Sequence, residues 1–228
     1  IDFPENIAAM ETTAAPIPVQ TPAPPVAPAR KIAQAAEAIA KARAPVILAG
    51  NGVIRFEASD ALRRFAEALR IPVANTFMAK GVLPFSHPLS LGTIGLSARD
   101  LPWFAFEAAD LIVCVGVDMV EYPPERWNPG ADKTLIHVGA LPAEVDAHYV
   151  VHTGVLGDVA NALEAIAAAA TPQREAPFAA VREAIERDRA ALADDAGFPV
   201  KPQKIVWDLR EALAPEDIVI SDVGAHKM

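Results

Sequence analysis

Two glycine-containing loops combine residue types that could contact a nucleotide. Gly50-Asn51-Gly52 and Gly116 each follow directly on a run of apolar residues. Glycine allows a backbone to approach a phosphate closely and to adopt a positive φ angle, so both loops could face a bound nucleotide. The spacing is not specific, because the first loop does not continue as G-x-G-x-x-G into a helix, and an ordinary turn explains it equally well.

A third loop, at residues 76–81, also follows an apolar run. It combines a hydroxyl group, apolar side chains and the cationic Lys80. A lysine in such a loop could attract an anionic substrate by its charge. On these residues alone, Lys80 could equally be a solvated surface group.

The histidines and the single cysteine form no metal-binding pattern. No two of the five histidines lie at i, i+4 on one expected helix, and no cysteine cluster supports them, so we predict no metal site. Cys114 lies within an apolar run and is expected to be a buried, unreactive thiol, and His137 a hydrogen-bonded core or rim group. His226 differs because it follows an expected strand and an Asp-x-Gly turn, where site residues often lie.

The elements that must position these loops are short buried strands that alternate with helices. Helical spacing of apolar residues predicts one helix with Ile32, Ala35, Ala36 and Ile39 buried, and a second with Leu62, Phe65, Ala66 and Leu69 buried and Ser59 as its N-cap. Further helices are expected at 98–109 and directly after Gly157-Asp158. Apolar runs predict strands at 45–49, 71–74, 111–115 and 135–138, a short strand at 150–151, and a loop-rich stretch at 76–95.

This alternation predicts an α/β fold, with residues 30–170 forming a Rossmann-like, doubly wound parallel sheet. In such sheets ligands bind outside the carboxyl ends of the strands, which is where the glycine loops would meet. Residues 1–29 are expected to be the tail of an upstream domain and a proline-rich linker, and residues 171–200 a linker and a helix. Residues 201–228 would begin a second α/β segment, with a helix at 201–213 and a strand at 218–220. The chain starts without Met and stops just after that strand, so we expect a fragment.

Composition excludes several classes of function. The net charge is -9 and the basic residues are dispersed, so the basic footprint that nucleic acid requires is missing. The hydrophobic content of 52% supports a large core, but no apolar run reaches the ~18–20 residues of a membrane span. No basic stretch followed by an apolar one opens the chain as a signal peptide would. One cysteine cannot form an internal disulfide, and we expect a cytoplasmic protein.

Several short motifs follow one another in a specific order along the chain. They are the strand and turn at 45–54, the T-x-M-x-K-G loop at 76–81, His87-Pro88, Leu91-Gly92-Thr93-Ile94-Gly95, Ala109-Asp110-Leu111, Ile136-His137-Val138, Pro142-Ala143-Glu144 and Gly157-Asp158. From about residue 44 to residue 167 this pattern resembles the central domain of the thiamine-diphosphate-dependent acetolactate synthase family.

The C-terminal residues extend the resemblance. Residues 221–228 are similar to the D-V-G-x-H-x-M segment that opens the diphosphate-binding domain of this family. The resemblance implies that Gly224, Ala225 and His226 contact the diphosphate of thiamine diphosphate. The family often has Gln at the position of Ala225, so a side-chain contact there would be lost. The resemblance also implies Mg²⁺, whose ligands would lie outside this chain together with the glutamate that activates the cofactor, so this chain alone is expected to be inactive.

Two loops bear on a flavin. Members of the family that bind FAD have H-x-D-x-D-P at a strand end, whereas residues 137–142 here read H-V-G-A-L-P. The loop from Glu121 to Asn128 instead reads E-Y-x-P-x-x-W-N, which is similar to the catabolic, flavin-independent members. We therefore expect no FAD, with Gly50, Asn51, Gly52 and Gly116 as a vestigial nucleotide loop. The resemblance places Met78 and Lys80 at the rim of the substrate channel.

The implied activity is decarboxylation of pyruvate and its condensation with a second 2-oxo acid, in a homodimer or homotetramer. One alternative is another thiamine-diphosphate-dependent decarboxylase of 2-oxo acids or acyl-CoA on the same scaffold. A second alternative is a stand-alone nucleotide-binding module, which would bind ADP, FAD or NAD tightly as an isolated chain.

Overall fold

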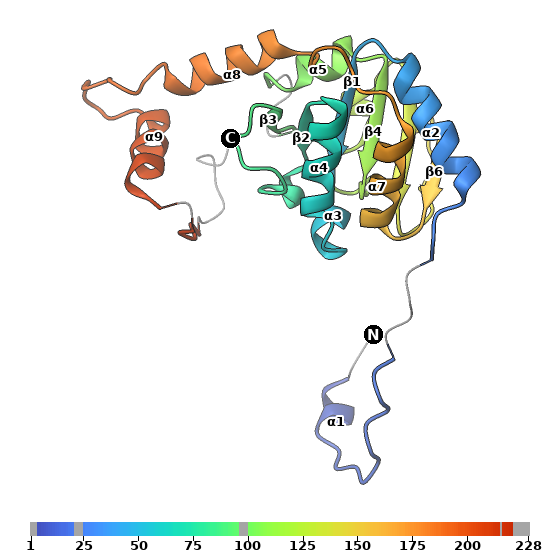
Figure 1. The fold of residues 1–228 in the computed structure, drawn as a ribbon. Helices are drawn as coiled ribbons and strands as arrows, with labels where there is room; N and C mark the ends of the chain where they lie inside the picture. The colour runs from blue at the N-terminus through green and yellow to red at the C-terminus, as the bar shows by residue number, and fades with distance from the viewer. Residues whose placement is uncertain (1–3, 21–24, 96–99, 215, 221–228) are drawn as a thin grey trace.

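A six-stranded parallel sheet forms the centre of the molecule (Figure 1). The computed structural model describes residues 4–20, 25–95, 100–214 and 216–220, and the strand count refers to these residues. The strands are β1 (Pro45–Ala49), β2 (Val73–Asn75), β3 (Ser90–Thr93), β4 (Leu111–Val115), β5 (Thr134–Gly139) and β6 (Thr153–Leu156). Their order in the sheet, β3-β2-β1-β4-β5-β6, is that of dinucleotide-binding Rossmann sheets. The predicted fold class is confirmed.

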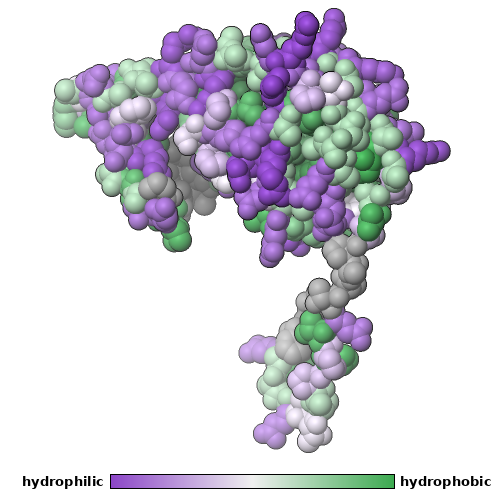
Figure 2. Space-filling view, in the orientation of Figure 1, coloured by the Kyte–Doolittle hydropathy of each residue, from purple (hydrophilic) through white to green (hydrophobic). Residues whose placement is uncertain are grey.

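Helices cover both faces of this sheet (Figure 1). One core contains residues of α2 (Ala29–Lys41), α4 (Ser59–Leu69) and α7 (Val159–Ala169), and the other contains residues of α5 (Trp103–Ala108), α6 (Pro124–Trp127) and α8 (Ala179–Ala190). Successive strand residues point to opposite faces, so Ile47 of β1 lies in the first core and Leu48 in the second. Figure 2 shows hydrophilic side chains on the outer surface of α4.

The predicted apolar stripes of the first two helices are confirmed. All eight of their residues are buried: Ile32, Ala35, Ala36 and Ile39 in α2, and Leu62, Phe65, Ala66 and Leu69 in α4. The helix expected after Gly157 is α7, and the carboxylate of Asp158 caps it by accepting a hydrogen bond from the backbone amide of Asn161 at 2.7 Å. These elements were predictable because the burial pattern repeats with the period of the helix.

Several expected boundaries were wrong. β3 lies inside the stretch expected to be loop-rich, and the strand expected at 150–151 forms at 153–156 as β6. Ser59 is the first residue of α4 rather than its N-cap, and α5 begins only at Trp103. The first glycine loop does enter a short helix, α3 (Gly52–Arg55). No described strand pairs with residues 218–220, which form no strand because a strand requires a hydrogen-bonded neighbour.

Among the helices of the described residues, two contribute no buried residue: α1 (Glu5–Ala8) near the N-terminus and α9 (Pro202–Ala212) near the C-terminus. Both lie away from the sheet (Figure 1). α8, by contrast, is attached to the segment around β3. Its Arg182 guanidinium donates hydrogen bonds to the carbonyls of Ser90 at 2.7 Å and Phe85 at 2.8 Å. Within the described residues, no helix has the length and apolar character needed to cross a membrane.

Candidate functional site

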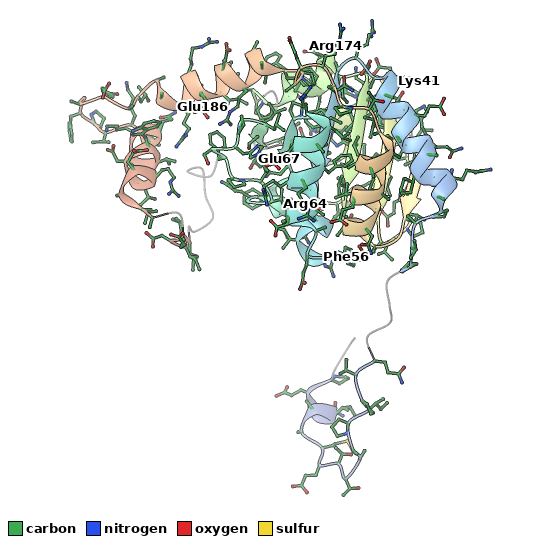
Figure 3. The ribbon with its side chains drawn as sticks, viewed as in Figure 1. Lys41, Phe56, Arg64, Glu67, Arg174 and Glu186 are labelled. Carbon is green, nitrogen blue, oxygen red and sulfur yellow. The ribbon has the colours of Figure 1, made fainter. Side chains whose placement is uncertain are left out.

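A cavity of about 550 Å³ lies at the carboxyl ends of the strands. Its lining comes from the loops that follow β1, β2, β4 and β5, and includes Asn51, Phe56, Met78, Gly116, Glu121 and Leu141. The strand order reverses between β1 and β4, and doubly wound sheets bind their ligands outside the strand ends at such a point. Phe56 marks this end of the domain, opposite the end marked by Lys41 (Figure 3).

Three glycines bring the loops after β1 and β4 into direct contact. The Gly50 amide donates to the carbonyl of Val115 at 2.9 Å, and the Gly52 amide donates to the carbonyl of Gly116 at 2.8 Å. A Cβ on Gly50 would lie 2.5 Å from the Gly116 oxygen, and one on Gly52 would lie 2.7 Å from the Gly116 Cα. Gly116 also has a φ of +59°, which favours glycine. The contact between the two loops therefore accounts for all three glycines.

Asn51 lies between the first two of these glycines, and its backbone amide donates to the Glu121 carboxylate. Both Glu121 oxygens accept from it, Oε1 at 3.0 Å and Oε2 at 3.1 Å. Oε1 also accepts from the Asp118 amide at 3.2 Å, and Oε2 accepts from the Thr76 hydroxyl at 2.5 Å. Because Thr76 follows β2, one carboxylate joins the loops after three adjacent strands.

All the backbone amides of the first glycine loop are consequently used inside the chain. Gly50 and Gly52 donate to the loop after β4, Asn51 donates to Glu121, and Val53 donates to the Gly50 carbonyl at 3.0 Å. Dinucleotide-binding sheets hold the pyrophosphate with the amides of this same turn. The residues present therefore do not fit a dinucleotide diphosphate at this loop.

Three further residues fix the E-Y-x-P-x-x-W-N segment that contains Glu121: Tyr122, Trp127 and Asn128. The Tyr122 ring packs on Gly95, where a Cβ would lie 2.9 Å from the ring carbons, and the Tyr122 carbonyl accepts from Trp127 Nε1 at 3.2 Å. Trp127 is buried and meets Phe106 and Tyr149 edge-on. Asn128 is buried too, and its Nδ2 donates to the His148 carbonyl at 2.7 Å.

His137 and Cys114 lie where the sequence predicts them. His137 is buried, and its ring nitrogens contact the Tyr149 hydroxyl at 2.9 Å and the Leu141 carbonyl at 3.2 Å. Burial lowers the pKa of His137 below its ordinary value, so the ring is neutral. Burial also raises the pKa of the Cys114 thiol to about 12, although the neighbouring Tyr149 hydroxyl opposes this. Cys114 is therefore an unreactive core thiol.

The structure brings some of the predicted site residues together and separates others. Asn51, Gly52, Gly116 and Met78 line the cavity, and Met78 is 55% exposed. Gly50 is packed against the loop after β4 and is not part of the lining.

The remaining predicted site residues do not line this cavity in the described chain. Lys80 is exposed to solvent and is not part of its lining. Gly224, Ala225 and His226 lie outside the described residues.

Two important residues of this site were not predicted. The sequence marks Glu121 only as the start of a motif, and Asn51, whose backbone amide donates to it, lies 70 positions earlier in the chain. Phe56 forms part of the cavity wall and remains 45% exposed. The one available signal is an acidic residue shortly after Gly116, the glycine that follows β4, and this does not by itself identify a partner.

A second cavity, of about 490 Å³, lies at the amino ends of β4, β5 and β6 beside α2. Its lining is mainly polar and includes Lys31, Lys41, Asp110 and His152. The sequence predicts no site there. Within the described residues, neither cavity nor any other region contains three or more His, Cys, Asp or Glu residues placed to hold a metal ion.

Known proteins are similar to this chain along its length. Residues 32–166 match the family model of the thiamine pyrophosphate enzyme central domain. The chain is 32% identical over 100% of its length to the probable acetolactate synthase large subunit of Methanocaldococcus jannaschii, and 30% identical over 92% of its length to the acetolactate synthase large subunit of Corynebacterium glutamicum. It is 29% identical over 90% of its length to the acetolactate synthase of Bacillus subtilis. The chain spans only 42%, 34% and 37% of these three relatives.

A solved structure from Mycobacterium smegmatis, described as a candidate thiamin diphosphate-dependent enzyme, has the same fold. It superposes with a TM-score of 0.57 at 29% identity, over 71% of this chain and 32% of that one. The family match covers more than half of the chain, and the strand order and the relatives agree with it. The chain therefore belongs to the thiamine pyrophosphate enzymes, and residues 32–166 form the central domain of that family.

Proposed function

We propose that this chain is part of a thiamine-diphosphate-dependent acetolactate synthase, which decarboxylates pyruvate and joins the product to a second 2-oxo acid. The observation that carries the proposal is the similarity to acetolactate synthases along 90–100% of the chain. Thiamine diphosphate supplies the electron sink that such a decarboxylation requires. Mg²⁺ would accompany the diphosphate.

The central domain has a structural role in this proposal. Its described residues contain no group of side chains placed to hold a metal ion. Its Cys114 and His137 are buried in the core, where His137 hydrogen-bonds to Tyr149. Met78 and Lys80 would contribute to the rim of the substrate channel, because they belong to the loop after β2 at the carboxyl edge of the sheet. Gly224, Ala225 and His226 would contact the cofactor diphosphate.

We further propose that the central domain binds no FAD. The support for this is the Glu121 carboxylate. It accepts the hydrogen bond from the Asn51 backbone amide, which a dinucleotide phosphate would otherwise accept. A homodimer or homotetramer in the cytoplasm completes the proposal. The acidic net charge of -9 is compatible with such a soluble assembly.

The decisive experiment is an assay of the full-length enzyme that contains this chain. Purified enzyme with thiamine diphosphate, Mg²⁺ and pyruvate should form acetolactate, detected as acetoin after acidification. Acetaldehyde and CO₂ without acetolactate would point instead to a decarboxylase on the same scaffold. Turnover of an acyl-CoA in place of pyruvate would do the same.

The visible spectrum of the same preparation tests for the flavin. We expect no absorption band of bound FAD, and a stoichiometric amount of FAD would refute that part of the proposal. Titration of the isolated chain with ADP, FAD and NAD tests the stand-alone nucleotide-binding module. Tight binding of any of the three would favour the module over the proposed enzyme fragment.

A further inference from the structure

The Glu121 side chain occupies the crossing point of three loops. Its carboxylate accepts four hydrogen bonds, two of them from the single amide of Asn51, one from the Thr76 hydroxyl and one from the Asp118 amide. These donors belong to the loops after β1, β2 and β4. Hydrogen bonds to an ionised acceptor are about twice as strong as neutral ones, so this one group contributes strongly to the arrangement of the three loops.

In dinucleotide-binding sheets with this strand order, a phosphate occupies the position that the Glu121 carboxylate has here. The turn after β1 in a dinucleotide-binding sheet presents its amides to a phosphate. Here the equivalent turn is Gly50-Asn51-Gly52, and the group that accepts its central amide is a carboxylate from the same chain. The oxygens of a carboxylate resemble those of a phosphate in charge and in capacity to accept hydrogen bonds.

The backbone around Glu121 holds the side chain in this place. The Asp118 carboxylate accepts from the Val120 amide at 3.0 Å, and the Asp118 carbonyl accepts from the Glu121 amide at 3.1 Å. Directly after Glu121, the Tyr122 ring packs against the backbone of Gly95. Because both flanks are fixed, the carboxylate reaches Asn51 and Thr76 without ordering a flexible loop first.

We propose that Glu121 is a positioning residue whose carboxylate takes the place of a nucleotide phosphate and fixes the loop at 76–80 through the Thr76 hydroxyl. This loop begins at Thr76, continues through η1 (Phe77–Ala79), and brings Met78 to the cavity wall. The inference rests on the proposed function only for the link between this loop and a substrate channel. The experiment below requires no catalysis, so its failure and the failure of the proposed function can be told apart.

The test is chemical rescue of the Glu121→Ala chain by acetate. In the 228-residue chain, removal of the carboxylate should speed hydrogen exchange of the Asn51 amide by about ten-fold or more, given the strength of hydrogen bonds to charged groups. Tryptic cleavage after the exposed Lys80 should accelerate as well. Acetate should slow both processes again in the variant and leave the unsubstituted chain unchanged, whereas neutral acetamide at equal concentration should have no effect.

Three further variants keep the test decisive. Glu125→Ala removes an exposed glutamate from the same segment and should leave Asn51 exchange and cleavage after Lys80 unchanged. Thr76→Val removes one donor and should accelerate cleavage after Lys80 while Asn51 stays protected. Glu121→Gln keeps the size of the side chain but loses the charge, and its Asn51 amide should exchange several-fold faster; this variant decides the matter if Glu121→Ala does not fold.

Two outcomes would overturn the proposal. The first is an Asn51 amide that stays as protected in both Glu121 variants as in the unsubstituted chain. The second is a response to acetate that acetamide or sodium chloride reproduces, because the effect would then not depend on a carboxylate at this position.

Discussion

Tyr149 donates its hydroxyl hydrogen to Nδ1 of His137 across 2.9 Å, and the two rings meet edge-on. The direction of this bond follows from the other ring nitrogen. Nε2 lies 3.2 Å from the Leu141 carbonyl, which can only accept, so Nε2 carries the hydrogen and Nδ1 is the acceptor. Both ring nitrogens of the neutral imidazole are therefore satisfied, and protonation of Nδ1 would remove the acceptor to which the Tyr149 hydroxyl donates.

Stability should fall in mild acid because of this pair. Burial lowers the pKa of His137 below its ordinary value of about 6.5. The unfolded chain therefore takes up a proton at a higher pH than the folded chain does. The contribution of His137 is complete above about pH 6.5 and is lost as the pH falls from there through the folded pKa, at about 1.4 kcal/mol per pKa unit.

Urea unfolding measures the contribution of His137 to stability. The unsubstituted chain and His137→Gln are compared at about pH 7.5 and about pH 5.5, on either side of the ordinary histidine pKa. The free energy of unfolding should drop more on acidification in the unsubstituted chain than in the variant. The other histidines are present in both proteins, so their contributions cancel in the comparison. Equal losses in the two proteins would show that His137 does not contribute to the acid sensitivity.

Gly116→Ala should be strongly destabilising, by about 3 kcal/mol. The left-handed backbone costs a Cβ about 1–2 kcal/mol, and the added atom would lie 2.6 Å from the Val53 nitrogen, which adds an overpacking term of similar size. Gly154→Ala in β6 is a matched control, because a Cβ there meets no atom within 4 Å. Thermal and urea unfolding should separate the two variants, and a tolerated Gly116→Ala would contradict the close contact between the loops.

Much of this fold could be predicted, because its core strands and helices carry their signal locally. β1 and β4 are buried over their whole length and read as continuous apolar runs. β3 was missed because it is an edge strand of four residues with one large apolar side chain, Leu91. Its neighbour β2 and the helix α8 make it a strand, and neither is visible in a local pattern.

The candidate site could be predicted only in part. The glycine loops were identified because glycine is itself a local signal for close backbone approach. The group that approaches them could not be predicted, because Gly50 and Gly52 contact Gly116 rather than a ligand. Glu121 reaches Asn51 and Thr76 across 70 and 45 positions of the chain. Such pairings depend on the order of the strands in the sheet, which an apolar pattern does not specify.

Asp110→Ala should destabilise the amino end of the sheet by about 2 kcal/mol, because two backbone amides lose an ionised acceptor. The Asp110 carboxylate accepts from the amides of Arg43 at 2.8 Å and Ala44 at 3.0 Å. Partial burial acts to raise the pKa of Asp110, but these two hydrogen bonds, the backbone amide of Asp110 itself and the charge of Arg43 together outweigh it and lower the pKa. The contribution should be present above the unfolded carboxyl pKa and be lost as the pH falls through the folded one.

The free energies of unfolding of Asp110→Ala and of Asp132→Ala, measured at neutral pH and in acid, check this prediction. Asp132 is an exposed carboxylate paired only loosely, at 3.4 Å, with Lys133, so its removal should change stability by less than about 0.5 kcal/mol. The difference between the two variants should shrink in strong acid. A difference that is independent of pH would mean that Asp110 stabilises the fold by packing rather than by its charge.

Arg182→Lys should loosen α8 from the sheet by about 1–2 kcal/mol, because lysine cannot reproduce the two-pronged geometry of a guanidinium. Arg182 donates to the carbonyls of Ser90 and Phe85, stacks 4.7 Å from the centre of the Phe85 ring and pairs with Glu186. Ile185 of the same helix then completes the core on that face. Hydrogen exchange of residues 179–190 should accelerate in Arg182→Lys and not in Arg187→Lys, an exposed control on the same helix. Unchanged exchange in both would mean that apolar packing alone holds α8 on the sheet.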